Sequence, residues 1–367
     1  MFWPDTENEH SESTARLPND SRSHACVTSR TFTYTPRTFR PPARVGTVVT
    51  VNAARFIRSA TSLRLAQALA ARAFPPQWRT RFAPAPTGYL HLGHVVNALH
   101  VWGVARAHGG QVLLRIEDHD RSRCRPEFER ALLDDLDWLG FTPDIGTTDE
   151  FRAGDTLRRQ SDNRQRYTAA LHSLAVRALE YGCICTRTDI AAIAGDRSGE
   201  EIRYPGTCAH ACHAAAIARR LRVSPETESF HDIRLGPQSQ TPQLQCGDFL
   251  VRDRNDNFTY QLCVTVDDWD QHIDVIIRGE DLLSSAGRQA QLARVLGRST
   301  SPQFLHHGLV LRSDGRKLSK SLGDTGVREM REAGLSREQV LGRATFACGL
   351  IDRDVSLNLD EITSLFA

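Results

Sequence analysis

Extended and helical hydrophobic patterns alternate along the chain from residue 80 onward. A short strand is predicted over Thr80–Pro84, apolar positions recur at helical spacing over Val95–Ala107, and Gln111–Ile116 is a mostly apolar strand. A strand, a helix and a strand in this order predict a βαβ unit, and therefore an α/β fold with a parallel sheet. A further amphipathic helix is expected over Pro126–Leu139, closed by Gly140.

The second half of the chain interrupts this alternation. A helix is predicted over Ser161–Tyr181, and the irregular pattern from Gly182 to about Gln245 indicates an inserted domain. Strands are then expected over Cys246–Asp253, Phe258–Val266, Ile273–Gly279 and Phe304–Leu311, with helices over Ser285–Leu296 and in the tail Ser336–Ala367.

Residues 1–77 differ in composition from the rest of the chain. The first twenty are polar and partly acidic, whereas residues 21–77 contain no Asp or Glu and are rich in Arg, Ser, Thr and Pro. The second composition is typical of transit peptides, but the acidic residues in front of it do not fit one. We therefore expect a disordered extension, or a start codon placed too early, in which only Thr61–Phe74 is helical and amphipathic.

Length and composition indicate an ordinary soluble protein. At roughly 150 residues per domain, 367 residues suggest two to three domains. The chain is 40% hydrophobic and 25% charged, and it has no apolar run of about 18 residues that would predict a membrane span. Nine scattered cysteines favour reduced thiols and a cytoplasmic location.

The net charge of +2 is unevenly distributed. Residues 1–77 hold ten Arg against five acidic residues, so residues 78–367 carry about −3. Proteins that coat RNA present a strongly basic surface. Any contact of the folded region with RNA is therefore expected to be local.

The first candidate for chemistry is the stretch RFAPAPTGYLHLGH at residues 81–94. Its prolines favour extended backbone, a turn follows, and a helix begins soon afterwards. In a parallel sheet, this arrangement points backbone N–H groups at a bound anion. His91 and His94 share a face once the helix has begun, and Gly93 leaves room for a ligand against the backbone.

The second candidate is the stretch GRKLSKS at residues 315–321. The chain has 44 Arg and two Lys, and both lysines, Lys317 and Lys320, lie in this stretch. A plain charged turn could use Arg, as the chain does elsewhere. An ammonium is a compact point charge that can follow a moving phosphate, so we expect a phosphate-binding loop.

The two stretches resemble the HIGH motif and the KMSKS loop of class I aminoacyl-tRNA synthetases in their glutamate/glutamine form. The resemblance covers roughly residues 78–350. It implies a Rossmann-like catalytic domain in two halves (78–181 and 246–310), a zinc-binding insertion (182–245), and a KMSKS-like loop with a helical tail (311–367). It also implies ATP with Mg²⁺, catalytic roles for His91, His94, Lys317 and Lys320, and contacts of Gly93, His91, His94 and Lys320 with ATP.

The resemblance also implies a glutamate site. In glutamyl-type synthetases the Arg of RFAPSPTG, the Glu of RIED, a strand Tyr and the Arg of VIRG hold the amino acid. With the neighbouring backbone, the matching residues are Arg81, Phe82, Ala83, Pro84, Ala85, Glu117, Tyr260 and Arg278. Taken singly, such residues would be a surface Arg or a core Tyr. Ala85 replaces the family's Ser, which removes a hydroxyl from the site.

A metal site is suggested by Cys183-Ile-Cys185 and by Tyr204-Pro-Gly-Thr-Cys208. Structural Zn²⁺ takes four ligands and favours thiolates. By spacing, Cys212 and His213 compete for the fourth position, and reduced cysteines in a small core are the alternative. The resemblance to glutamyl-queuosine synthetases implies Cys183, Cys185, Tyr204 and Cys208 as ligands, with Cys212 in reserve.

About 46 residues follow Ser321, too few for the anticodon-binding region of a glutamyl-tRNA synthetase. The chain therefore resembles the truncated glutamyl-queuosine tRNA(Asp) synthetases. This implies ATP-dependent, tRNA-independent activation of L-glutamate, followed by transfer to queuosine in the anticodon loop of tRNA(Asp), by a monomer without membrane contact. The alternatives are a truncated glutamyl-tRNA synthetase charging the tRNA 3′ end and a non-catalytic RNA-binding module.

Overall fold

The computed structural model describes residues 56–154, 157–194, 201–211, 213–310 and 326–367. All of them belong to one compact unit, Thr50–Ala367. Among them, no helix is both long enough and apolar enough to cross a membrane.

The predicted βαβ unit is confirmed. Strand β1 (Arg79–Phe82) pairs in parallel with β2 (Gln111–Leu114), and helix α2 (Leu92–Ala107) connects them. The helix begins at Leu92 rather than at the predicted Val95, because His91 serves as its N-cap. Most of α2 is buried, so it forms the centre of the main hydrophobic core.

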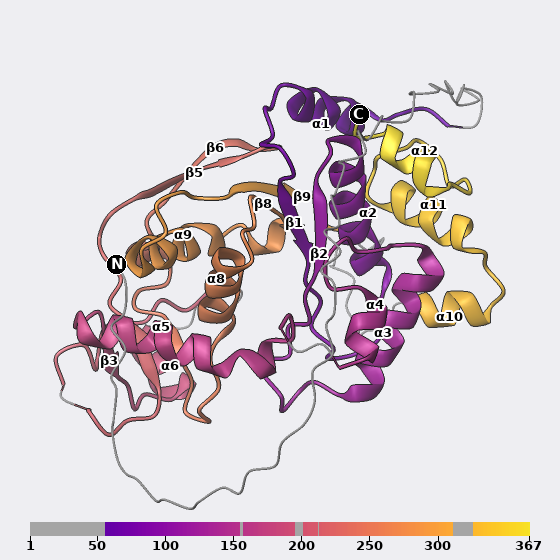
Figure 1. Cartoon of the computed structure of the whole chain (residues 1–367). Helices are drawn as coiled ribbons and strands as arrows, with labels where there is room; N and C mark the ends of the chain where they lie inside the picture. Colours follow the sequence, from indigo (N-terminus) through magenta and orange to yellow (C-terminus); the bar gives the residue numbers. More distant parts are fainter. Residues whose placement is uncertain (1–55, 155–156, 195–200, 212, 311–325) are drawn as a thin grey trace, which may run out of the picture. The chain divides into compact units, whose positions relative to one another are not determined.

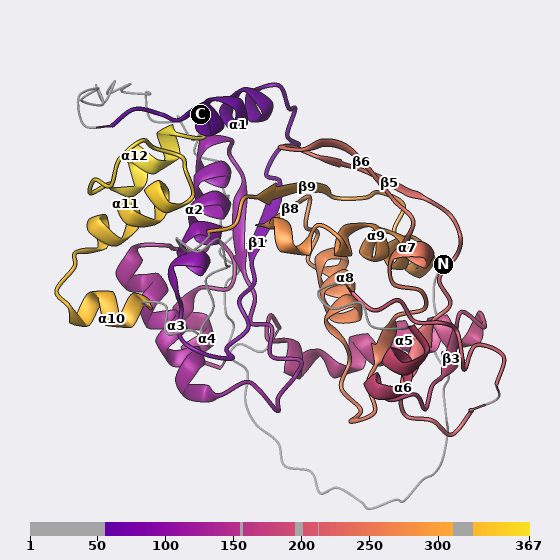
Figure 2. The same ribbon diagram turned by 180° about the vertical axis from the view of Figure 1, so that it is seen from behind.

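A second, four-stranded sheet from the second half of the chain lies beside β1 (Figure 1). Strand β8 (Val275–Gly279) pairs in parallel with β9 (Gln303–His307), and β1 lies beside β8, where the N–H of Asp274 donates to Arg79 O at 2.9 Å. In both views, α2 lies to one side of these strands and α8 (Tyr260–Asp270) and α9 (Ser285–Leu296) to the other (Figure 2). The carboxyl ends of β1, β2 and β8 thus open toward one region, where α/β folds bind ligands.

Part of the range predicted as an insertion belongs to this sheet. Strand β5 (Glu228–Asp232) pairs in parallel with β9 at Asp232 and in antiparallel with β6 (Gly236–Gln240). The separate small sheet consists of β3 (Glu180–Gly182), β4 (Arg219–Leu221) and β7 (Leu250–Arg252). Helices α6 (Arg187–Ala194) and α7 (Pro242–Gln245) lie in the same range. The predicted strand Cys246–Asp253 is shorter because Cys246 caps α7.

The strand predicted over Phe258–Val266 is wrong, because this segment begins helix α8. Its run of apolar and β-branched residues is typical of a buried strand. All positions from Leu262 to Asp268 are buried, and α8 packs against both α5 (Arg164–Val176) and α9. A helix covered on several sides has no polar face, so the 3.6-residue period cannot be read from it.

The helix predicted over Ser161–Tyr181 is also shorter than expected. A 3₁₀ turn over Gln160–Asn163 precedes α5, and Ala178, at φ 54°, lies between α5 and β3. By contrast, α3 (Pro126–Leu139) and α9 have the predicted bounds and end at left-handed glycines, Gly140 and Gly297. Two further short helices are α4 (Thr148–Arg152) and the 3₁₀ turn Glu280–Leu282.

The prediction of a disordered extension is wrong for residues 56–77. The helix predicted there over Thr61–Phe74 is confirmed as α1 (Ala60–Ala70), but its Leu65 and Leu69 belong to the main core. The chain around its start contacts the C-terminal segment, where the helices predicted over Ser336–Ala367 are α11 (Arg337–Ala347) and α12 (Leu359–Ser364). Helix α10 (Val327–Glu332) precedes them. The Ser59 N–H donates to Leu350 O at 3.0 Å, so chain segments far apart in sequence are joined here.

Candidate functional site

A cleft of about 400 Å³ lies at the carboxyl ends of β1 and β8, beside the start of α2. Its lining includes eight of the predicted residues: Arg81, Ala83, His91, Gly93, His94, Glu117, Tyr260 and Arg278. Phe82, Pro84 and Ala85 are not among the lining residues, and Phe82 is part of the core. The fold therefore brings residues from four separate segments into one cavity.

The two histidines meet at the N-terminus of α2. Nδ1 of His91 accepts from the Gly93 N–H at 3.1 Å, and Nδ1 of His94 accepts from the His91 N–H at 3.1 Å. Because both Nδ1 atoms accept, each neutral ring carries its proton on Nε2. A Cβ on Gly93 would lie 3.0 Å from the His91 ring, so a larger residue there would crowd the N-cap. The positive end of the helix macrodipole faces the same position, which favours an anion there.

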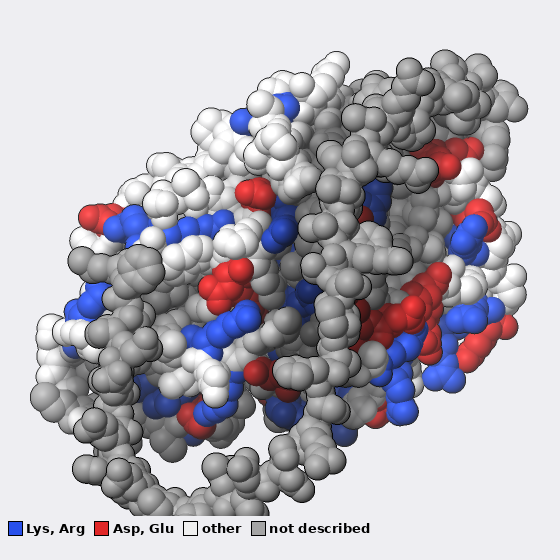
Figure 3. Space-filling model, in the orientation of Figure 1, with Lys and Arg blue, Asp and Glu red and all other residues white. Residues whose placement is uncertain are grey.

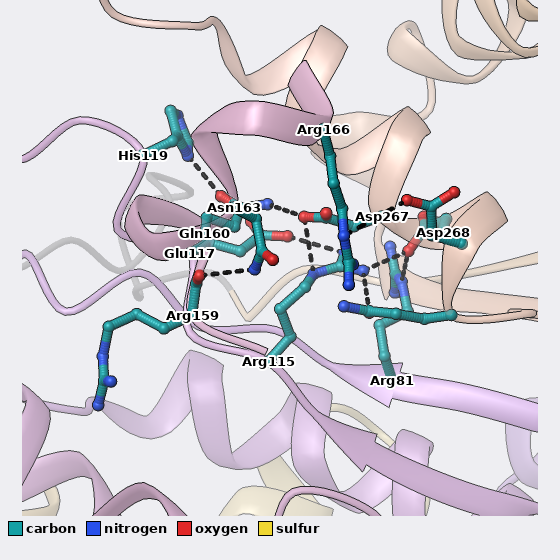
Figure 4. Close-up of polar contacts among 12 residues, drawn as sticks. Arg81, Arg115, Glu117, His119, Arg159, Gln160, Asn163, Arg166, Asp267 and Asp268 are labelled. Carbon is teal, nitrogen blue, oxygen red and sulfur yellow. Dashed lines mark hydrogen bonds and ion pairs between the residues drawn. The ribbon is translucent and has the colours of Figure 1, made fainter. Parts of the chain in front are cut away.

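Arg81 and Glu117 are connected by buried side chains that the sequence analysis missed (Figure 4). Arg81 Nε donates to Asp268 Oδ1 at 3.0 Å, and Arg115 Nη1 donates to the same oxygen at 2.8 Å. Arg115 Nη2 in turn donates to Glu117 Oε1 at 3.0 Å. One buried guanidinium thus fixes two predicted substrate-binding residues relative to each other.

Charge neutralisation explains how these groups tolerate burial. Burial by itself would lower the pKa of Arg115, but the carboxylates of Asp268 and Glu117 raise it above its ordinary value. Burial would raise the pKa of Asp268, but Arg81 and Arg115 lower it below its ordinary value. The network is therefore ionised and internally paired, as buried charges must be.

A second layer lies behind this network. Asp267 accepts from Tyr167 Oη at 3.0 Å and from Gln160 Nε2 at 2.7 Å, and burial raises its pKa to about 6. His119 Nδ1 lies 2.7 Å from Gln160 Oε1, so the network reaches the loop after β2. The sequence did contain one signal for this network. Asp267 and Asp268 end an apolar run, and carboxylates buried at such a place need hydrogen-bonding or charged partners.

Arg278 and Tyr260 occupy the opposite wall of the cleft. Arg278, at the end of β8, is 3% exposed and donates from Nη1 to Gln289 Oε1 at 2.8 Å. Its Nη2 is buried and has no hydrogen-bond partner among the described residues. Tyr260 is the first residue of α8, not a strand residue as expected, and burial raises the pKa of its hydroxyl. A buried donor without a partner is costly, so this wall is suited to an anionic ligand.

Lys317, Lys320 and Cys212 lie outside the described residues. Val310, the last described residue before the lysine stretch, lines the cleft. Gly326, the first described residue after it, forms a β-bridge with His91, and the next residue, Val327, donates its N–H to Leu90 O at 2.9 Å.

The predicted metal ligands are brought together at one place. The Sγ atoms of Cys183, Cys185 and Cys208 lie within 4.8 Å of one another, and Cys185 Sγ is 3.5 Å from Cys208 Sγ. The Tyr204 hydroxyl is 3.6 Å from Cys183 Sγ. Zn–S bonds of about 2.3 Å in a tetrahedron put the sulfur atoms about 3.8 Å apart, so these residues fit a zinc ion.

The other candidate that the structure describes, His213, does not belong to this group. Arg220 Nε donates to Cys183 Sγ at 3.2 Å, and its guanidinium stacks on the Tyr204 ring at 3.6 Å.

Basic and acidic side chains are intermixed over the part of the surface that the described residues form in Figure 3. Many are paired, as Arg152 is with Asp137 at 2.6 Å. The view agrees with the charge of about −3 for residues 78–367 and gives no sign of an extended basic surface among the described residues there.

Comparison with known proteins identifies the family. Residues 77–347 match the family model for tRNA synthetases class I (E and Q), catalytic domain. Proteins named glutamyl-Q tRNA(Asp) synthetase are similar over most of the chain. The one from Symbiobacterium thermophilum is 37% identical over 78% of this chain and 91% of its own length, and that of Nitratidesulfovibrio vulgaris is 35% identical over 74% and 87%. The one from Burkholderia cenocepacia is 41% identical over 69% of this chain and 83% of its own length.

Solved structures agree at the level of the fold. A glutamate tRNA ligase from Elizabethkingia meningosepticum superimposes with a TM-score of 0.63 at 24% identity, covering 78% of this chain. This chain spans 64% of that protein's length. The parallel strands, the helix-start histidines and the family match lead to one conclusion. The chain belongs to the class I aminoacyl-tRNA synthetases of the glutamate/glutamine type, in the group of ligases whose curated members are named glutamyl-Q tRNA(Asp) synthetase.

Proposed function

We propose that this enzyme activates L-glutamate with ATP, without tRNA, and transfers the glutamyl group to queuosine in the anticodon loop of tRNA(Asp). The observation that carries the proposal is the convergence of Arg81, Glu117, Tyr260 and Arg278 with two helix-start histidines in one cleft. The names of relatives at 35–41% identity support the choice of acceptor. Glutamate tRNA ligases share the fold at 24% identity.

Glutamate carries two carboxylates and one ammonium group, and the cleft offers a partner for each. The buried Nη2 of Arg278 is a donor for a carboxylate, and Arg81 is a second guanidinium on the facing strand. Glu117, held by Arg115, is an acceptor for the ammonium group. A neutral amide in place of the side-chain carboxylate would lose the charged pair with an arginine, which provides selection against glutamine.

Activation joins a carboxylate oxygen of glutamate to the α-phosphorus of ATP, while the bond between that phosphorus and the oxygen of the leaving pyrophosphate breaks. Negative charge develops on the phosphate oxygens in this step. The Nε2–H groups of His91 and His94 and the N-terminus of α2 are donors for that charge. We propose the same role for Lys317 and Lys320, by resemblance to the KMSKS loop. Mg²⁺ bound with ATP would neutralise part of the phosphate charge.

In the second step, a hydroxyl oxygen of the queuosine cyclopentene-diol attacks the carbonyl carbon of glutamyl-adenylate. An ester bond forms, and the bond between the carbonyl carbon and the adenylate phosphate oxygen breaks. AMP leaves with the electron pair, and the proton of the attacking hydroxyl passes to a phosphate oxygen or to solvent. The proposed structural zinc, held by Cys183, Cys185, Tyr204 and Cys208, would order the small domain around β3, β4 and β7.

The acceptor is tested by incubating the protein with ATP, labelled glutamate and purified tRNA(Asp) that carries queuosine. We expect pyrophosphate exchange that depends on glutamate and needs no tRNA, and labelling that is lost after mild base. Periodate oxidation of the queuosine diol should abolish labelling. Because periodate also oxidises the tRNA 3′ end, a tRNA blocked only at its 3′ end is the matched control and should still be labelled.

The alternatives predict different outcomes. If the 3′ block stops labelling, or if queuosine-free tRNA(Glu) is charged efficiently, the chain is a glutamyl-tRNA synthetase. If the protein binds tRNA but shows no exchange, it is a non-catalytic binding module.

A further inference from the structure

Arg278 is held in the cleft by buried hydrogen bonds that begin on β5. Asp232 Oδ2 lies 2.7 Å from Nδ1 of His306, and His306 Nε2 lies 3.0 Å from Nε of Arg278. Asp232 and His306 are both fully buried, with exposed fractions of 0%. Three strands, β5, β9 and β8, each contribute one member of this chain of contacts.

The hydrogen-bonding capacity of each group fixes the tautomer of His306. The Nε of an arginine can only donate, so Nε2 of His306 must accept. Nδ1 then carries the proton and donates to Asp232, whose carboxylate accepts. One neutral tautomer therefore satisfies both bonds. A protonated ring would turn Nε2–H toward the N–H of Arg278, and two donors would face each other at 3.0 Å.

Asp232 is itself rigidly held. Its Oδ1 accepts from the backbone N–H groups of Arg234 at 2.9 Å and Leu235 at 2.8 Å, and Oδ2 accepts from the His306 N–H at 2.9 Å. A carboxylate that accepts from these three backbone donors is fixed in position. It therefore constrains both the orientation and the tautomer of the imidazole.

The arrangement leaves one nitrogen of Arg278 for a ligand. Nε is bound to His306 and Nη1 to Gln289, while Nη2 is buried without a partner among the described residues. We propose that neutral His306, oriented by Asp232, is a positioning residue that directs Arg278 Nη2 toward a carboxylate of the substrate. This inference rests on the proposed function, because it takes glutamate as the ligand of the cleft.

The charged groups around His306 predict how acid affects the contact between His306 and Arg278. Asp232 faces the ring from β5, Arg278 from β8 and Arg81 from β1, and Arg234 Nε donates to the His306 carbonyl oxygen. Burial lowers the pKa of His306 and Arg278 lowers it further, while Asp232 opposes this in part. The ring is therefore neutral near pH 7 and gains its proton only below the ordinary histidine range. Acid should consequently weaken glutamate binding through His306.

The test compares His306→Leu, His306→Gln and the control His231→Gln in glutamate-dependent pyrophosphate exchange. His231 neighbours Asp232 on β5, but its side chain contacts Arg72. For His306→Leu we expect KM for glutamate to rise about 10- to 100-fold, the range for a lost hydrogen bond to a charged group, with KM for ATP unchanged. In His306→Gln, the amide oxygen can still accept from Arg278, so most of the affinity should return.

A pH series separates positioning from a merely structural role. Glutamate binding, measured by calorimetry between pH 4.5 and 7.5, should weaken in acid more steeply in the wild type and in His231→Gln than in His306→Gln, whose amide does not titrate. Glu117 and Asp267 also lie near the site and are present in every variant. The effect of His306 is therefore read from the difference in pH dependence between the wild type and His306→Gln.

Two results would overturn the inference: an unchanged KM for glutamate in folded His306→Leu, or equal pH dependence in the wild type and His306→Gln. If His306→Leu does not fold, the pH series with His306→Gln decides. Failure of the proposed function itself looks different, because the wild-type protein would then show no glutamate-dependent exchange. If Arg278→Met raises KM for glutamate but folded His306→Leu does not, the site stands and the role of His306 is refuted.

Discussion

Asp135 is a buried carboxylate that the proposed chemistry does not use. It lies on α3, is 5% exposed, and its Oδ2 has no hydrogen-bond partner among the described residues. Burial raises its pKa to about 7, although Arg331 lies close enough to oppose the shift. The native state therefore favours the protonated acid, whereas the unfolded chain titrates at the ordinary value of 3.8.

This shift predicts a loss of stability with rising pH. The contribution of Asp135 is fully present below the ordinary carboxyl pKa and is lost as the pH rises through about 7. Asp135→Asn has no such charge, so it should be more stable than the wild type at pH 8, with a difference on the order of a few kcal/mol. The measurement is urea unfolding at pH 5 and pH 8.

The exposed neighbour Asp134, whose side chain is 63% exposed, provides the control variant Asp134→Asn. Equal losses of unfolding free energy between pH 5 and pH 8 in the wild type and Asp135→Asn would show that Asp135 is not the titrating group.

At the scale of elements, the small sheet of β3, β4 and β7 and the cysteine cluster form a unit apart from the cleft. None of Cys183, Cys185, Tyr204 and Cys208 lines the cleft. Loss of a structural metal there should loosen this part of the chain first, because such sites contribute folding energy directly.

We therefore predict about one zinc ion per purified chain, measured by elemental analysis, in keeping with a site of four ligands. Cys208→Ala should lose the metal, whereas Cys124→Ala, outside the cluster, should keep it. Glutamate activation is expected to persist in Cys208→Ala while transfer to RNA falls. A native protein that is fully active and contains no zinc would rule out the assignment.

At the scale of the whole molecule, the segment before the catalytic strands is part of the same core as the C-terminal helices. Arg58 Nη2 donates to Leu365 O at 2.6 Å, and Ser62 Oγ donates to the same oxygen at 3.2 Å. The family match begins only at residue 77, so α1 is an addition to the matched region.

This packing predicts that α1 contributes to global stability. Leu69 is 0% exposed within the main core, so Leu69→Ala should lower the free energy of unfolding by about 2–5 kcal/mol. Leu63, on the same helix, is 46% exposed, and Leu63→Ala should change it by no more than about 0.5 kcal/mol. Denaturant unfolding followed by far-UV circular dichroism compares the two, and equal midpoints would contradict the assignment of α1 to the core.

Sequence patterns predicted those elements whose ends carry local signals. Helices α3 and α9 have the predicted bounds because Gly140 and Gly297 adopt the left-handed conformation that ends a helix. Helix α8 was predicted as a strand because it is buried on several sides. Helix α1 was predicted over Thr61–Phe74, but its place in the core was not, because its apolar face is covered by residues far along the chain.

The chemical groups of the site can be identified from local motifs, which contain the two histidines at the start of α2, Arg81, Glu117, Tyr260, Arg278 and the clustered cysteines. The groups that orient them become visible only in the folded chain. Arg115 meets Asp268 across 153 positions of sequence, Asp232 meets His306 across 74, and His306 meets Arg278 across 28. Hydrogen-bond geometry between distant strands leaves no local pattern, because it depends on which chain segments the sheet places side by side.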